Sequence, residues 1–185
     1  MTPRGAVPVR SFLAAGACLV LASCASPPYS SDLPLEPGER VSRDAAMRFR
    51  VPAGWIDAGG ESADPRRVVW LVRSDYAASI AVQEIVLDSV ARAVVARGDV
   101  CVLAGLVQDV GGDGGAPPEA FTLDGRRYCA WEGMGGGGGK AVRVVVFAAG
   151  TKSYEVRAVA PAGGTRRGAE EVFRAQQKLL ESLRW

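Results

Sequence analysis

Two consecutive β-hairpins in the second half of the chain constrain its fold more than any other feature. Apolar segments 119–123 and 126–133 flank a single Asp-Gly dipeptide. A two-residue Asp-Gly turn between such segments is a strong hairpin signal, because both residues tolerate positive φ angles. Segments 140–149 and 152–160 form a second pair around Gly150-Thr151. Strands joined by such short turns must run antiparallel.

The first half of the domain adds three predicted strands. Met47, Phe49 and Val51 alternate with arginines, which predicts a half-buried strand. Segment 67–73 is apolar between two terminal arginines. Segment 79–87 is β-branched and apolar on both faces, which is typical of a central strand. The sequence therefore predicts a sheet of about six to seven strands.

A helix is predicted between these two groups of strands. Residues 89–108 are rich in Ala and Val and follow two candidate N-cap residues, Asp88 and Ser89. Counting the helical period through this segment places Val94, Cys101, Val102 and Gly105 on its inner face.

The C-terminal segment 165–182 predicts a second, amphipathic helix. Its apolar stripe comprises Val172, Phe173, Gln176, Leu179, Leu180 and Leu183. The predicted order along the chain is three strands, one helix, four strands in two hairpins and a final helix. This order predicts the α+β class. In this arrangement an antiparallel sheet is flanked by helices.

The N-terminus has the pattern of an export signal. Arg4 and Arg10 precede the apolar stretch 11–21, which is shorter than the roughly 20 residues that span a bilayer. The sequence Leu-Ala-Ser-Cys at 21–24 closely resembles the bacterial lipobox. That resemblance implies cleavage after residue 23, lipid attachment to the Cys24 thiol and anchoring in a membrane. The alternatives are an ordinary signal with an incidental cysteine, or a short N-terminal anchor.

Processing at this site changes the charge of the protein. Of 22 basic side chains, two lie in residues 1–23, which leaves 20 basic against 20 acidic ones in the mature chain. A charge-balanced chain has no long-range attraction for a polyanion, so we expect no nucleic-acid partner. By resemblance to lipoproteins, Ala25 in place of an Asp after Cys24 favours the outer membrane, facing the periplasm.

The mature chain divides into two parts by composition. Segment 24–43 contains Pro27, Pro28, Pro34 and Pro37 without apolar periodicity, which predicts an extended tether. A single domain is predicted over residues 44–185.

Residues with catalytic potential are few. The chain contains no histidine, which removes the commonest general base and metal ligand. We therefore expect no metal, cofactor or catalytic residue. Glu84 lies in an apolar segment, either as a buried acid or at a solvated strand end, the commoner case. The glycine run 135–139 lacks the remaining residues of a phosphate-binding loop and predicts a hairpin tip.

Two cysteines besides Cys24 remain in the mature chain, Cys101 and Cys129. In an oxidising cell envelope they either form a disulfide or remain two buried thiols. A bridge between them closes a loop of about 29 residues, with roughly 3–4 kcal/mol expected from chain entropy. The four tryptophans, Trp55, Trp70, Trp131 and Trp185, either belong to the core or line a binding groove.

Three segments together resemble the PsbP/Mog-like superfamily. They are the opening Phe-x-Val-Pro-x-Gly-Trp at 49–55, Tyr-Glu-Val-Arg-Ala at 154–158 and the ending Leu-Leu-Glu-Ser-Leu-Arg-Trp at 179–185. The resemblance covers about residues 44–185 and implies a curved antiparallel sheet flanked by helices. It implies binding or assembly functions and no shared catalytic residue.

These observations favour a membrane-anchored lipoprotein of the bacterial cell envelope. Its domain is expected to bind an envelope protein partner or a small ligand without catalysis, through one sheet face or the glycine-rich loops. The alternatives are an envelope enzyme that uses carboxylates such as Glu84, and a purely structural surface lipoprotein.

Overall fold

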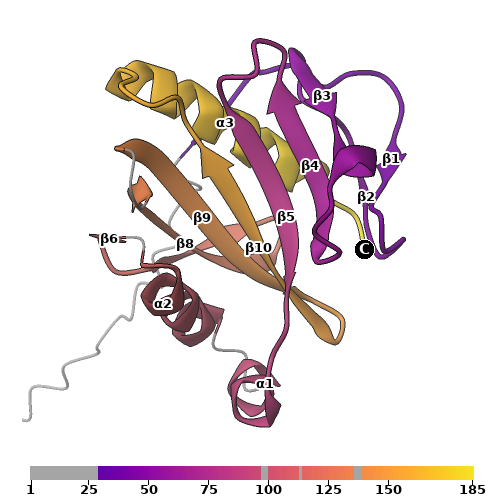
Figure 1. The fold of residues 1–185 in the computed structure, drawn as a ribbon. Helices are drawn as coiled ribbons and strands as arrows, with labels where there is room; N and C mark the ends of the chain where they lie inside the picture. Colours follow the sequence, from indigo (N-terminus) through magenta and orange to yellow (C-terminus); the bar gives the residue numbers. More distant parts are fainter. Residues whose placement is uncertain (1–28, 97–99, 113, 136–138) are drawn as a thin grey trace, which may run out of the picture.

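A computed structural model describes residues 29–96, 100–112, 114–135 and 139–185 (Figure 1). Its main sheet has the strand order β3-β4-β5-β10-β9-β8-β6, and β7 also pairs with β8; every pair is antiparallel. The strands are β3 (Trp55–Asp57), β4 (Arg67–Arg73), β5 (Ser79–Ile85), β6 (Gly114–Gly115), β7 (Glu119–Leu123), β8 (Arg126–Gly135), β9 (Lys140–Ala149) and β10 (Lys152–Val159). The predicted α+β class, with an antiparallel sheet flanked by helices, is confirmed.

The two predicted hairpins are present. Between β7 and β8, Asp124 has φ 50° and Gly125 has φ 74°, the left-handed pair that a two-residue hairpin turn requires. Between β9 and β10, Gly150 has φ 61°. These turns fix the register of the strands that follow them.

The helix α3 (Arg166–Ser182) covers one side of this sheet. Its N-cap is Thr165, whose hydroxyl accepts a hydrogen bond from the backbone N–H of Gly168. Every residue of the predicted apolar stripe is buried. The side chains that pack between α3 and the sheet include Val69, Leu71, Ile80, Val82, Val145, Phe147, Val156, Phe173, Leu179 and Leu180.

Two shorter helices replace the single helix predicted over 89–108. They are α1 (Ser89–Ala96) and α2 (Val100–Gly111), and Asp88 caps the first by accepting the Ala91 N–H at 2.7 Å. The predicted inner face is wrong for Val102, which is 45% exposed, whereas Val100, Leu103 and Ala104 of α2 are buried. Because α2 is a separate helix that begins at Val100, its buried face must be counted from that residue. A count that starts at residue 89 assigns the wrong residues of α2 to the buried face.

The segment 47–51 does not join the main sheet. Its strand β2 (Arg48–Phe49) pairs with β1 (Arg40–Val41), and a short 3₁₀ helix follows at Gly59–Glu61. Met47, Phe49 and Val51 are nevertheless buried, as their alternation predicts. Alternation identifies a buried face but not the strand that pairs with it.

The predicted domain boundary at residue 44 is wrong. Leu35 forms a bridge with Pro52, and the Glu36 N–H donates to the Val51 carbonyl at 2.8 Å. Tyr29 and Leu33 pack against the main core. The domain therefore extends back at least to Tyr29, and only the part of the predicted tether before it, including Cys24, lies outside the described residues.

Candidate binding face

The side of the sheet opposite α3 is only partly covered. α2 packs on β8 and β9, and within the described residues no helix lies over β4, β5 and β10 on this side (Figure 1). Because side chains alternate along a strand, the residues between those that face α3 point to this side. We call them the open face: Arg67, Trp70 and Val72 of β4, Ser79, Ala81 and Gln83 of β5, and Glu155, Arg157 and Val159 of β10.

The strand register aligns the open face in rows. Trp70 pairs with Ala81, and Ala81 pairs with Arg157. The small side chains of Ser79 and Ala81 on the central strand leave space between the larger residues of β4 and β10. The surface of the open face is therefore recessed along β5, relative to the side chains of β4 and β10.

Two hollows occupy the open face. The upper hollow has a volume of about 450 Å³ and is lined by Trp70, Val72, Ser79 and Val159, with further residues from the loops beside β3. The lower hollow has a volume of about 460 Å³. It lies between β5, β10 and α2, and its lining includes Gln83, Glu155, Arg157, Leu106, Val107 and Val110. The row from Trp70 to Arg157 separates the two.

Charges of both signs lie on the open face. The guanidinium of Arg67 stands over the Trp70 ring, 5.1 Å from its centroid. Arg157 and Glu155 form an ion pair with 3.7 Å between Nε and Oε1. A flat aromatic surface beside charges of both signs is suited to a mixed polar and apolar partner.

The rim of the lower hollow is apolar and exposed. Val86 is 78% exposed and Val110 is 90% exposed, and Leu106 is also exposed. Neighbouring exposed apolar side chains are typical of interaction surfaces. The sequence does not predict this surface, because the outward face of α2 is recognisable only once the start of the helix at Val100 is known.

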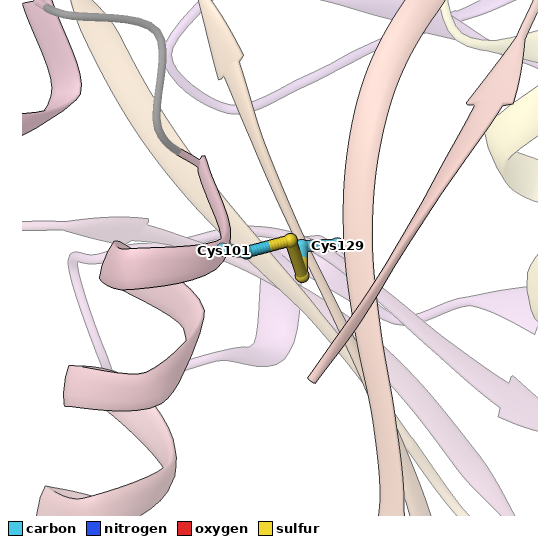
Figure 2. The surroundings of a disulfide bond; sticks show 2 residues. All are labelled: Cys101 and Cys129. Carbon is cyan, nitrogen blue, oxygen red and sulfur yellow. A yellow bond between two sulfur atoms is a disulfide. The ribbon is translucent and has the colours of Figure 1, made fainter. Parts of the chain in front are cut away.

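A disulfide holds α2, one wall of the lower hollow, against the sheet. Figure 2 shows the side chains of Cys101 on α2 and Cys129 on β8 joined, with an S–S distance of 2.06 Å and Cα atoms 5.2 Å apart. Of the two alternatives that the sequence leaves open, the structure has the bridge. It sits beside a small apolar cluster of Val100, Leu103, Ala104, Trp131, Val144 and Val146.

Of the two alternatives for Glu84, the structure has the commoner one, a partly exposed position near a strand end, although the strand is not an edge strand. Glu84 lies near the end of β5, a central strand, and its Oε2 is 2.9 Å from the Lys152 ammonium. The same ammonium lies 3.1 Å from Asp44 Oδ2, which also accepts the Tyr154 hydroxyl at 3.0 Å. The lysine bridges the two carboxylates and offsets part of their negative charge, so the cluster joins residue 44 to the sheet.

The titration behaviour of this cluster follows from its contacts. Partial burial raises the pKa of Asp44, but hydrogen bonds from Ser42, Ala46, Lys152 and Tyr154 outweigh it and the net pKa is lowered. Burial, together with Asp44, raises the pKa of Tyr154 to about 12. The pKa of Lys152 is raised by its two carboxylate partners.

The tryptophans divide between core and surface. Trp55 and Trp131 are buried, whereas Trp70 lies on the open face. Trp185 is partly exposed, stacks on Phe147 and lies under the Arg126 guanidinium. Within the described residues no group of three or more Cys, Asp or Glu side chains has the arrangement of a metal site. The centre of the glycine run, residues 136–138, lies outside them.

An unexpected charge lies buried on the α3 side of the sheet. Arg143 of β9 is fully buried and donates to Gln176 Oε1 at 2.8 Å and to Gln177 Oε1 at 3.2 Å. Burial lowers the pKa of Arg143 to about 10. The Tyr29 ring covers the guanidinium, 5.0 Å away. No sequence signal marks this residue, because it lies among valines in a strand.

Solved structures with the same arrangement of strands and helices include two PsbP/Mog-type proteins. Cyanobacterial PsbP (CyanoP) from Synechocystis sp. PCC 6803 matches with a TM-score of 0.50 at 16% identity, over 80% of this chain and 91% of that one. The Ran-binding protein Mog1p from Saccharomyces cerevisiae matches with a TM-score of 0.54 at 11% identity, over 82% and 96%. The chain shares their fold. The expected PsbP/Mog-like architecture is thereby confirmed.

A looser match is LpqN, involved in cell envelope biogenesis of Mycobacterium tuberculosis, with a TM-score of 0.39 at 17% identity over 74% of this chain and 81% of that one. No protein-family model and no curated protein sequence matches the chain. Among the described residues, no helix is both long enough and apolar enough to cross a bilayer.

Proposed function

We propose that the protein is a lipoprotein of the bacterial cell envelope, anchored through Cys24, whose open face binds an envelope protein without catalysis. The observation that carries the binding role is the open face itself. A large part of one sheet side holds two hollows, an aromatic ring and paired charges, with no helix over it in the described chain.

The shape of the open face favours a protein segment over a small ligand. Pockets for small molecules enclose most of the ligand surface. Here both hollows open to solvent, and both are lined by residues of β5. We take the small β5 side chains Ser79 and Ala81, which lie between Trp70 and Arg157, as a shallow groove that connects the two hollows. An extended segment laid along the groove contacts both hollows, while Trp70 and Arg157 flank it. The fold also occurs in Mog1p, which binds a protein.

Site-specific photo-crosslinking in intact cells tests this proposal. A photoreactive residue in place of Gln83 lies on the open face, whereas the same residue in place of Ala148 lies on the exposed end of β9. We expect a discrete crosslinked protein from position 83 and none from position 148. Equal crosslinking from both positions contradicts the proposal.

A groove-filling variant gives the second measurement. Ala81→Trp places an indole in the centre of the groove, and Ala148→Trp is its matched control at an exposed position. We expect the first to abolish the position-83 adduct while circular dichroism and the thermal midpoint stay close to those of the control. Retention of the adduct in a folded Ala81→Trp protein excludes the groove as the binding site.

The lipid anchor has its own test. Cys24→Ser removes the thiol that receives the lipid, so the protein should no longer partition into a detergent phase. Full-length Cys24→Ser protein that still partitions into detergent refutes the anchor and leaves the binding role of the open face intact.

The enzyme alternative has no supporting observation in the described residues. Its proposed acid, Glu84, is paired with Lys152, and that pair supports the contact with Asp44. A broad hydrolase assay with the purified protein is expected to show no turnover. Turnover that Glu84→Gln abolishes would establish the alternative.

A further inference from the structure

Tyr29 is held in place by three separate elements. Its hydroxyl donates to Glu132 Oε1 of β8 at 2.7 Å. Its ring packs edge-on against Phe173 of α3 at 5.6 Å and covers Arg143 of β9. Burial and the Glu132 carboxylate raise the pKa of Tyr29, so its hydroxyl stays protonated and continues to donate. Position 29 is therefore a fixed point of the domain.

This fixed point lies very close to the proposed lipid anchor along the chain. Five residue steps separate Cys24 from Tyr29, and they span at most about 18 Å when fully extended. A free tether over 24–43 would reach about 70 Å by the same measure. A domain of this size has a diameter of about 40 Å. With the shorter reach, the domain cannot rotate freely above a bilayer, and the part of its surface nearest Tyr29 must stay near the lipid.

Two elements end at the surface within about 10 Å of the residues that hold Tyr29. Phe173 lies two turns from the start of α3, about 10 Å along the helix. Glu132 and Arg143, which pair across β8 and β9, lie three register positions from Gly135 and Lys140, the end of the ladder. Figure 1 shows the start of α3 and of β9 at the same end of the domain. We call Met134, Lys140, Arg166 and Arg167 the anchor end.

The chemistry of the anchor end fits a phospholipid surface. The side chains of Arg166 and Arg167 are 95% and 89% exposed, and Lys140 and the apolar Met134 are exposed beside the hairpin end. Both arginines contact glutamates one turn along α3, but such exposed ion pairs are weak. Headgroup phosphates can therefore replace these partners, and basic residues near an anionic surface are attracted to it.

We infer that the anchor end rests on the phospholipid headgroups of the membrane that holds Cys24. This inference rests on the proposed lipidation. Tyr29 and Arg143 lie on the α3 side of the sheet, whereas the open face lies on the opposite side. The orientation therefore leaves the lower hollow of the open face away from the lipid, whereas the upper hollow, which Lys140 of the anchor end also lines, lies nearer the membrane.

Spin labels on the lipidated full chain in vesicles test the orientation. The vesicles contain phosphatidylglycerol and a nickel-chelating lipid, which relaxes nearby nitroxides. Ala162→Cys carries a label next to the start of α3, and Thr151→Cys carries the matched label at the β9–β10 turn. We expect several-fold stronger relaxation at position 162 than at position 151. A twenty-residue Gly/Ser insertion after Ala25, which extends the reach as a flexible coil, should remove the difference.

Separate measurements test the lipid anchor, the orientation of the domain and the role of the arginines. The mass of the chain reports the lipid on Cys24 separately, and its absence overturns the anchor and the orientation together. Equal relaxation at the two labels in a lipidated chain overturns only the orientation. The double variant Arg166→Gln, Arg167→Gln should lower the relaxation at position 162 on anionic vesicles. Relaxation at position 162 that the double variant leaves unchanged overturns the role of the arginines.

Discussion

Removal of the Cys101–Cys129 bridge tests how α2, and with it the lower hollow, is held in place. The two cysteines are 28 positions apart, so the bridge closes a loop of about 29 residues, which corresponds to roughly 3.5 kcal/mol of chain entropy. The buried side chains of α2 are Val100, Leu103 and Ala104. Their burial contributes about 5 kcal/mol, so the bridge is comparable to the whole apolar contact of the helix.

We therefore expect the variant Cys101→Ala, Cys129→Ala to fold with a markedly lower free energy of unfolding. A loss of about 3.5 kcal/mol corresponds to a fall of roughly 7–14 °C in the thermal midpoint for a domain of this size. Since α3 packs on the other side of the sheet, the core there should remain intact. Amide hydrogen exchange should therefore accelerate first in α2 and only weakly in α3.

Chemical denaturation followed by tryptophan fluorescence measures the change, because Trp131 is buried in the cluster beside the bridge. Reduced wild-type protein should match the double variant, and reductant should leave the variant unaffected. If the free energies of unfolding of the oxidised wild type and the variant differ by less than about 1 kcal/mol, the bridge does not stabilise the protein through loop entropy. Mass spectrometry that finds both thiols alkylated without reductant would refute the bridge itself.

Two further predictions concern the N-terminal contacts and the helix cap. Asp44 has a lowered pKa, so its stabilising effect is complete above its ordinary pKa of 3.8 and is lost as the pH falls through the lower folded value. In Asp44→Asn, the free energy of unfolding, measured by urea titration, should fall less between about pH 5 and pH 2 than in the wild type. An equal fall in both proteins contradicts this. Thr165→Ala should cost about 1 kcal/mol of unfolding free energy because the Gly168 N–H loses its acceptor, whereas Thr165→Ser should cost little in the same denaturation assay.

Local sequence signals predict most of the main sheet and its helices. The hairpin turns at 124–125 and 150–151 depend on residues that accept positive φ, and such preferences act within a few positions. The buried stripe of α3 follows from a helical period over an uninterrupted segment. Segment 67–73 was predicted with the bounds that β4 has, because arginines end the apolar stretch on both sides.

Long-range contacts account for what the sequence does not predict. Proline content indicates an extended conformation for 24–43, but it says nothing about what that extended chain contacts. Tyr29 meets Glu132 across 103 positions, and Ser42 and Asp44 belong to a network with Lys152. The open face likewise depends on register, since Trp70, Ala81 and Arg157 become neighbours only through two strand pairings.

The open face follows from the connectivity of the chain and the size of its elements. Seven strand positions at 4.8 Å spacing make the main sheet about 29 Å wide. α2 has 12 residues, so it is about 18 Å long and about 10 Å across, and it covers the width of only two or three strands. The disulfide fixes it over β8, at one side of the sheet. Among the described residues, no helix therefore lies over β4, β5 and β10 on that side. The small residues Ser79 and Ala81 between Trp70 and Arg157 then give this uncovered area the shape of a groove, so groove-filling changes at Ala81 should affect binding far more than folding.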